Sequence, residues 1–153
     1  MARLRGEHEE EVEASPEACF AVAADLDGAP AWHGTMQEVE VIERDADGRA
    51  IQVRTTADAG IAKIRLELSF SYDAPHGMRW KRTGGDLSDL EGAWAFTPVG
   101  DGRTRVRHTL ELDPGRRLGL LARGPVLDKL RDRLVAQPAQ GLKRTAEASA
   151  PPA

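Results

Sequence analysis

The chain has 153 residues, which fits a single domain built around one hydrophobic core. Hydrophobic residues make up 41% of it and charged residues 30%, a balance that excludes disordered and fibrous proteins. The net charge of -4 argues against a nucleic-acid-binding protein. Cys19 is the only cysteine, which excludes an internal disulfide and a multi-cysteine metal site.

The start of the chain has no apolar run of the kind found in secretory signals, and no stretch approaches the ~20 apolar residues that span a bilayer. We therefore expect a cytoplasmic protein with no integral membrane segment. The ending Ala-Ser-Ala-Pro-Pro-Ala is small and proline-rich. This composition predicts a flexible tail over 148–153, behind a single domain over 1–147.

A strand and two short helices are predicted next. The acidic alternation over 7–13 is typical of a strand that is at most partly buried. Ser15 and Pro16 suit the N-cap and the first position of a helix. One face of that helix carries Cys19, Phe20, Ala23 and Ala24.

The segment after this helix holds two turn signals. We expect Asp27-Gly28 to end the first helix, and Pro30 to begin a second one that carries Trp32 and His33. Trp32 would then lie where the helices meet the sheet. We expect His33 to be exposed.

Six strands follow, joined by short turns rich in glycine and aspartate. Apolar and polar residues alternate along them, so each strand presents one apolar and one charged face. Consecutive strands joined by short turns pair antiparallel in a meander, whose apolar face needs a cover. The predicted strands span 37–45, 50–57, 61–72, 78–83, 87–99 and 103–112.

A C-terminal helix supplies that cover. From Pro125 onwards, apolar residues recur at helical spacing: Val126, Leu127, Leu130 and Leu134. Pro138 and Gly141 interrupt the pattern, and a proline inside a helix costs ~3 kcal/mol. We therefore predict a kink or break near 134–138. The fold class is α+β.

Three segments of the sequence together resemble the START-like superfamily, also called SRPBCC, and within it the bacterial polyketide cyclase/dehydrase and lipid-transport-like proteins. They are the Ser-Pro-Glu helix start at 15–17, the Asp-x-x-Pro-x-Trp element at 27–32 and the Asp-Pro-Gly at 113–115 before the last helix. The resemblance covers about residues 7–146. It implies a helix-grip fold, in which a curved antiparallel sheet of about seven strands surrounds the C-terminal helix.

The resemblance also implies a cavity between the sheet and that helix for a hydrophobic or aromatic molecule. An oxygenase branch of the superfamily carries an added iron–sulfur domain, which this chain lacks, so we expect no redox cofactor. The four histidines, at 8, 33, 76 and 108, are scattered, and we predict no metal site. The segment 116–124 is a candidate mobile lip over the cavity.

Three residues are candidates for catalysis. His108 falls on the apolar face of the last strand, where an imidazole can orient a ligand or exchange a proton, or can serve as a core residue. The alternation of the strand over 78–83 places Arg82 on its inward face, where Asp86 or Asp89 is a candidate ion-pair partner. Relatives with aromatase/cyclase activity place an inward arginine near a tyrosine, here Tyr72.

Large flat side chains on the inward face suit an apolar cavity, although the same residues also suit plain core packing. From 101 to 133 the chain has nine basic and five acidic residues, an excess that fits a solvated face better than contact with a membrane or a carrier protein. The expected ligand-contacting residues are Trp32, Phe70, Tyr72, Trp80, Trp94, Phe96, His108, Leu130 and Leu134.

Three functions remain open on this evidence. The favoured one is a non-catalytic carrier or sensor of a small hydrophobic molecule such as a lipid, quinone or polyketide. The alternative is a polyketide cyclase/aromatase, which closes a ring and removes water without a metal or redox cofactor. It needs two or more polar groups that converge in the cavity. A partner-binding module acting on a ribosome or chaperone would instead show a filled cavity and an exposed apolar patch.

Overall fold

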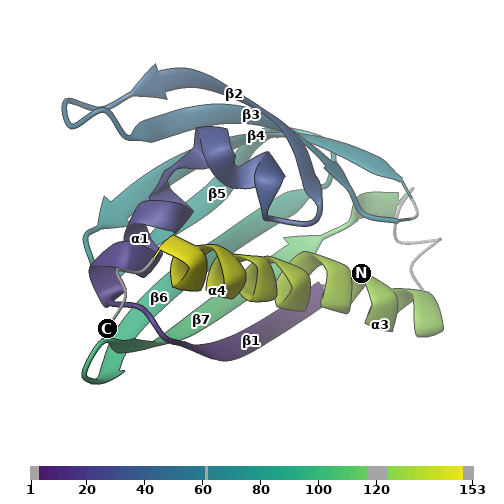
Figure 1. Cartoon of the computed structure of the whole chain (residues 1–153). Coiled ribbons are helices and arrows are strands. Elements are labelled where there is room, and N and C mark those ends of the chain that lie inside the picture. The colour runs from purple at the N-terminus through teal and green to yellow at the C-terminus, as the bar shows by residue number, and fades with distance from the viewer. Residues whose placement is uncertain (1–3, 61, 117–123, 150–153) are drawn as a thin grey trace.

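The computed structural model describes residues 4–60, 62–116 and 124–149. A seven-stranded antiparallel sheet curves around the C-terminal helix, as Figure 1 shows, in the order β1-β7-β6-β5-β4-β3-β2. The α+β helix-grip fold is therefore confirmed. The strands are β1 (Leu4–Val12), β2 (Met36–Arg44), β3 (Ala50–Asp58), β4 (Lys63–Asp73), β5 (Gly77–Gly85), β6 (Asp89–Gly100) and β7 (Arg103–Asp113).

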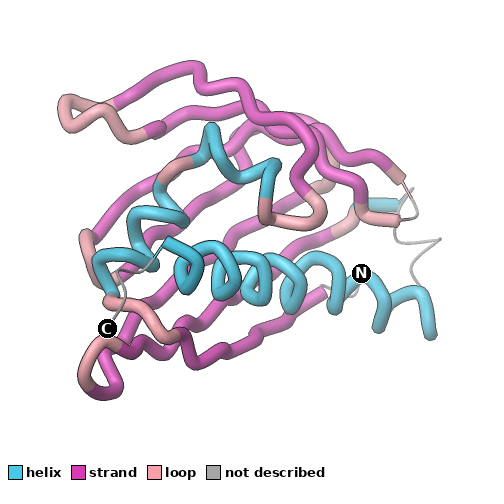
Figure 2. The backbone as a smooth tube through the Cα atoms, in the orientation of Figure 1, coloured by secondary structure: helices cyan, strands magenta, loops and turns pink. Residues whose placement is uncertain are grey.

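The two helical segments after the first strand and the C-terminal helical run lie on the concave side of the sheet (Figure 2), and they bury the apolar face predicted from the alternation. In β4, for example, Ile64, Leu66, Leu68 and Phe70 are buried while Arg65, Ser69 and Ser71 are exposed. In β7, Val106, His108, Leu110 and Leu112 are buried in the same way. The period of two thus decides which side chains can reach a cavity.

The first helix, α1 (Pro16–Ala24), begins as predicted, because the Ser15 hydroxyl accepts a hydrogen bond from the Ala18 N–H at 3.1 Å. Its end differs from the prediction. α1 stops at Ala24, and a 3₁₀ helix, η1 (Leu26–Ala31), begins at once. Asp27-Gly28 and Pro30 therefore lie inside η1, and Trp32 follows as its C-cap.

The C-terminal helical run continues through Pro138, but its α-helical pattern is interrupted over 132–136, which overlaps the region where the sequence predicts a kink or break. A π-helical segment precedes that residue, and in it the Gln137 N–H bonds to the carbonyl of Asp132, five residues back. Pro138 then falls in the first turn of the next α-helix, where its missing N–H is tolerated. The run consists of α3 (Pro125–Arg131), the π segment η2 (Asp132–Ala136) and α4 (Gln137–Ser149).

Gly141 does not interrupt the helix either. It lies in α4 where the helix meets the segment after η1, and a Cβ there would lie 3.0 Å from the carbonyl carbon of Trp32 and closer still to its oxygen. Only a residue without a side chain allows this approach. The glycine therefore brings α4 directly against the backbone that carries Trp32 and His33.

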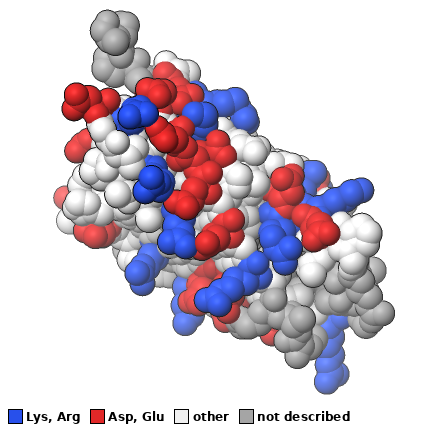
Figure 3. Space-filling model, turned by 90° about the horizontal axis from the view of Figure 1, so that it is seen from below, with Lys and Arg blue, Asp and Glu red and all other residues white. Residues whose placement is uncertain are grey.

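The outer face of β1 and β7 carries a ladder of ion pairs, and Figure 3 shows acidic and basic side chains side by side over this face. Arg103, Arg105 and Arg107 of β7 pair with Glu11, Glu9 and Glu7 of β1. Arg5 and Glu111 form a fourth pair. The basic excess in the sequence after residue 100 is thus largely matched by the acidic first strand.

Two further predictions concern the ends of elements. α4 extends to Ser149, two residues into the predicted tail over 148–153, and residues 150–153 lie outside the described part. Most of the predicted lip over 116–124 also lies outside it. No helix in the described part of the chain is long and apolar enough to cross a bilayer.

Candidate functional site

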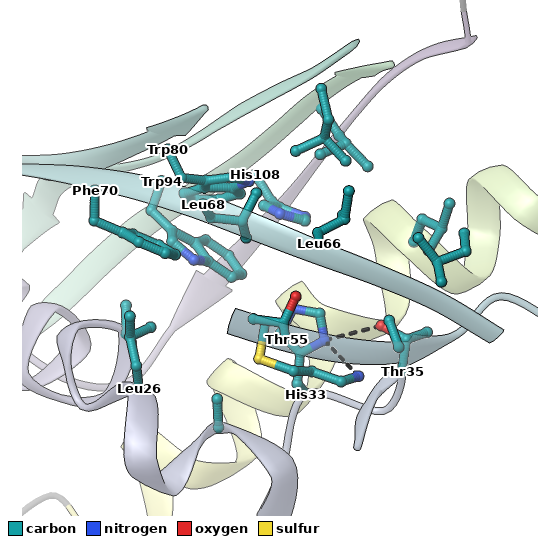
Figure 4. Close-up of a pocket in the computed structure, with 18 of the residues that line it drawn as sticks. Leu26, His33, Thr35, Thr55, Leu66, Leu68, Phe70, Trp80, Trp94 and His108 are labelled. Atoms are coloured by element: carbon teal, nitrogen blue, oxygen red, sulfur yellow. Dashed lines mark hydrogen bonds between the residues drawn. The ribbon is translucent and has the colours of Figure 1, made fainter. Parts of the chain in front are cut away.

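An apolar cavity lies between the concave face of the sheet, η1 and the C-terminal helical run (Figure 4). Its volume is about 90 Å³, the space of a few water molecules. Strand residues of β3 to β7 form the sheet side, and Leu26, Trp32 and Leu134 close the helical side. Among the described residues that line it, the polar side chains are few: His33, Thr35, Thr55 and His108.

Aromatic rings form one wall of this cavity. The His108 ring stacks on Trp94 with ring centroids 4.2 Å apart, and Trp80 lies 5.7 Å from the same imidazole. Trp80 in turn contacts Phe70 at 5.8 Å. Gly92 makes the arrangement fit, because a Cβ there would lie 2.5 Å from the Trp80 ring. The wall is therefore a set of tilted aromatic rings with one imidazole stacked on Trp94.

His108 is 2% exposed and is held from the helix side. Its Nδ1 lies 2.8 Å from the carbonyl oxygen of Val135, in the π-helical segment. Burial lowers the pKa of His108 to about 4, although the Val135 hydrogen bond opposes that shift. The imidazole is therefore neutral at pH 7.

His33 approaches the cavity from the segment after η1, which corrects the expectation that it is exposed. The residue is half-buried, and its Nδ1 lies 3.0 Å from the Thr35 hydroxyl and 3.4 Å from the Met36 backbone nitrogen. Figure 4 draws both contacts as dashed lines. Burial, and secondarily the nearby His108, lower the pKa of His33 to about 3. This second imidazole is also neutral at pH 7.

Thr55 adds a hydroxyl to the same cavity. It is 3% exposed, comes from β3 and lines the same cavity as His33 (Figure 4). Among the described residues, no hydrogen bond is found to its hydroxyl or to the indole N–H of Trp80 or Trp94, and no fully buried side-chain nitrogen or oxygen lacks a partner, so these groups keep some exposure. The cavity thus contains polar groups that a ligand can satisfy.

Most of the predicted ligand-contacting residues line the cavity, and some do not. Tyr72 and Phe96 pack around Phe20 beside α1, and Leu130 is buried but lies outside the lining. The structure brings together Trp32, Phe70, Trp80, Trp94, His108 and Leu134.

Two catalytic candidates lie away from the cavity. The Tyr72 hydroxyl donates to the carbonyl of Ala50 at 2.5 Å, and burial raises its pKa to about 12. Arg82 turns towards the end of its own strand and donates to the carbonyls of Gly85 and Asp86. Strand parity alone places it inward, and the structure corrects that expectation. Of the three candidates, only His108 faces the cavity.

Other reactive groups are not gathered into a site. Cys19 is fully buried, and burial raises the pKa of its thiol to about 11, so it is not a nucleophile at neutral pH. Among the described residues, no group of three or more histidine, cysteine, aspartate or glutamate side chains could hold a metal ion. The chemistry available in the cavity is therefore that of imidazole, hydroxyl and indole groups.

Comparison with protein families identifies the chain. The model of the family described as polyketide cyclase/dehydrase and lipid transport matches residues 3–147. The chain belongs to this family. A search among curated proteins finds no match.

Several solved structures share the fold over nearly the whole chain. A protein from Thermus thermophilus is 27% identical, with a TM-score of 0.83 over 96% of this chain and 99% of that one. A START superfamily protein from Mycobacterium smegmatis is 21% identical, with a TM-score of 0.81 over 94% and 97%. The Zhui aromatase/cyclase from Streptomyces sp. R1128 is 17% identical, with a TM-score of 0.81 over 98% and 100%.

Proposed function

We propose that this member of the polyketide cyclase/dehydrase and lipid transport family is a carrier or sensor that binds a small hydrophobic molecule between the sheet and the C-terminal helix. The observation that carries the proposal is the apolar cavity, walled by Phe70, Trp80 and Trp94 and supplied with a few polar groups. Ligand sites of this kind combine apolar walls with a small number of placed polar groups.

The size of the cavity limits how the ligand enters. Pockets for drug-sized ligands enclose ~300–1,000 Å³, and an engineered cavity of ~150 Å³ takes up benzene. A cavity of about 90 Å³ is smaller than both. A ligand must therefore displace wall side chains, and half-buried Trp32 and Leu134, on the helical side, can move at least cost.

Native mass spectrometry of the protein purified from its own host tests this proposal. We expect a reproducible adduct with the mass of a lipid, quinone or polyketide. Ala57→Leu adds three carbons to a residue that lines the cavity and should abolish the adduct. Thr56→Leu, at the neighbouring residue with opposite strand parity, should retain it. A bare wild-type protein, or an adduct that survives Ala57→Leu, would contradict the proposal.

A second candidate function is a cyclase/aromatase of the lyase type. The observation that favours it is the presence of two imidazoles, His33 and His108, in one apolar cavity. Such a cavity could hold a poly-β-ketone in a folded, near-attack shape while an imidazole removes a proton next to a carbonyl. We propose no metal or redox cofactor for this reaction.

Turnover of a poly-β-ketone thioester separates the two functions. A carrier would release the compound unchanged. A cyclase would convert it to an aromatic product, and His108→Ala would lower the rate by about 10²-fold or more if His108 transfers the proton. A rate that is unchanged in His108→Ala would remove this residue from the reaction.

Partner binding on a ribosome or chaperone has less support. The cavity is small, as that function requires, but Ile42 is the exposed large hydrophobic residue in the described part of the chain. One isoleucine, 48% exposed, does not form an apolar patch. A cytoplasmic location and transient contact with a membrane or carrier protein stay predictions.

A further inference from the structure

The two cavity histidines are held in opposite protonation patterns. A carbonyl oxygen can only accept a hydrogen bond, so the Nδ1 of His108, 2.8 Å from the Val135 oxygen, must carry the proton. Because the ring is neutral, its Nε2 is an unprotonated acceptor. No described residue donates to this nitrogen, and the side chain is 2% exposed.

His33 shows the reverse pattern. A backbone N–H can only donate, so the Met36 N–H makes the Nδ1 of His33 an acceptor, and the Thr35 hydroxyl can donate to the same nitrogen. The proton of this neutral ring must then lie on Nε2. Among the described residues, no acceptor is bound to that N–H.

The two rings belong to one aromatic chain around the cavity. Trp32 contacts His33 at 5.6 Å and Trp94 at 6.3 Å, and Trp94 stacks on His108. Both imidazoles line the same space, with Leu66 and Leu68 among its apolar walls. The cavity therefore offers one fixed donor and one fixed acceptor among tilted aromatic rings and aliphatic side chains.

We propose that the cavity recognises a ligand with both a carbonyl and a hydroxyl group: the His33 Nε2–H donates to the carbonyl, and the His108 Nε2 accepts from the hydroxyl. The inference rests on the proposed binding function and narrows its ligand. It follows from the rigidity of the two tautomers, because a ligand without these groups leaves two polar nitrogens unsatisfied.

The tautomers can be observed without any ligand. Long-range ¹H–¹⁵N correlation spectra of the wild-type protein at pH 7 distinguish a protonated ring nitrogen from an unprotonated one. We expect protonated Nδ1 in His108 and protonated Nε2 in His33. The same tautomer in both rings, or rapid exchange between tautomers, would overturn the inference.

Matched one-ring probes test recognition, with tryptophan fluorescence as the readout of Kd. The full probe is 3-hydroxybenzaldehyde; 3-methoxybenzaldehyde lacks the donor, 3-methylphenol lacks the carbonyl and toluene lacks both. Each lost hydrogen bond should weaken binding about fivefold to tenfold. Equal affinities for all four probes would overturn this inference and leave the binding function standing. Failure of every probe to bind would count against both.

Substitutions at the two histidines test which one recognises the hydroxyl group of the probe and which one recognises its carbonyl group. His108→Leu should remove the preference for hydroxyl over methoxyl, and His108→Gln, whose amide supplies an acceptor, should restore part of it. His33→Leu should remove only the preference for the carbonyl. Circular dichroism checks that each variant folds. If a variant does not fold, the NMR spectra and the probe series on the wild-type protein still test the proposal. Hydroxyl preference that persists in folded His108→Leu would overturn the assignment.

Discussion

The two faces of strands β1 and β7 use polar groups in opposite ways. On the outer face, four ion pairs join the strands, and the arginines and glutamates in three of them are between 43% and 59% exposed. On the inner face, the buried His108 and Thr104 are each held by one backbone carbonyl, and the partly buried His8 and Glu10 bond to each other. Each exposed ion pair contributes little to stability because water solvates both charges. A buried polar group, in contrast, must have a defined hydrogen-bond partner and orientation. The comparison predicts that mutational sensitivity is concentrated on the inner face.

The largest effect should come from Gly141→Ala, where α4 meets the backbone of Trp32. The new Cβ would overlap a backbone carbonyl, which cannot rotate away. Overpacking of this kind costs ~1–3 kcal/mol, and the gain in helix propensity of ~1 kcal/mol offsets only part of it. We expect a loss of ~2 kcal/mol in the free energy of unfolding, measured with urea.

Gln140→Ala is the matched control for this change. Its side chain is exposed on the same turn of α4, so the free energy of unfolding should stay within ~0.5 kcal/mol of wild type. If Gly141→Ala is as stable as Gln140→Ala, the close approach of α4 to Trp32 is not needed. Mutational sensitivity would then not be concentrated on the inner face.

Gly92→Ala should have the next largest effect. Its Cβ would lie 2.5 Å from the Trp80 ring, which is a side chain and can tilt at some cost. We expect a loss of ~1–2 kcal/mol in unfolding free energy, together with a shift in tryptophan emission as the ring moves into the cavity. Unchanged emission would show that the Trp80 ring does not pack directly against Gly92.

Acid should destabilise the protein through the inner histidines. Burial lowers the pKa of His108 to about 4, whereas the unfolded chain binds this proton near pH 6.5. As the pH falls below 6.5, the unfolded state therefore takes up a proton that the native state refuses. The free energy of unfolding should decrease by up to ~1.4 kcal/mol per pH unit for His108, with His33 acting in the same direction.

Urea unfolding between pH 6.5 and 5 measures this slope before most carboxylates titrate. His108→Gln should flatten it, and His76→Gln, at an exposed histidine, should leave it as in wild type. Equal slopes in all three proteins would mean that the buried imidazole does not govern the acid response.

The sheet is predictable from the sequence because alternation directly reports which side chains face inward. The alternation alone assigns His108, Trp80 and Trp94 to the inward face, where all three line the cavity. The N-cap residue Ser15 and the proline after it likewise locate the start of α1. Strand parity fails at Arg82, where a long side chain near a strand end turns back to bind the carbonyls of Gly85 and Asp86.

Other features depend on contacts between distant segments, which no local pattern records. Gly141 has the sequence context of a helix breaker, but its role is set by the carbonyl of Trp32, more than a hundred residues earlier. The expectation that His33 is exposed is wrong because no local pattern shows that Thr35 and Met36 hold its ring. The basic residues of β7 look unmatched in the sequence because their partners lie in β1, at the other end of the chain.

The smallest effect should come from the outer ladder. Arg103 and Glu11 lie 2.6 Å apart, yet both are about half exposed, and exposed pairs contribute ~0.5 kcal/mol in double-mutant cycles. Arg103→Ala, Glu11→Ala and the double variant should therefore give a coupling energy of this size. It should vanish in 1 M NaCl, where the screening length is ~3 Å. A coupling above ~1.5 kcal/mol that resists salt would show that the ladder, and not only the cavity face, holds β1 in place.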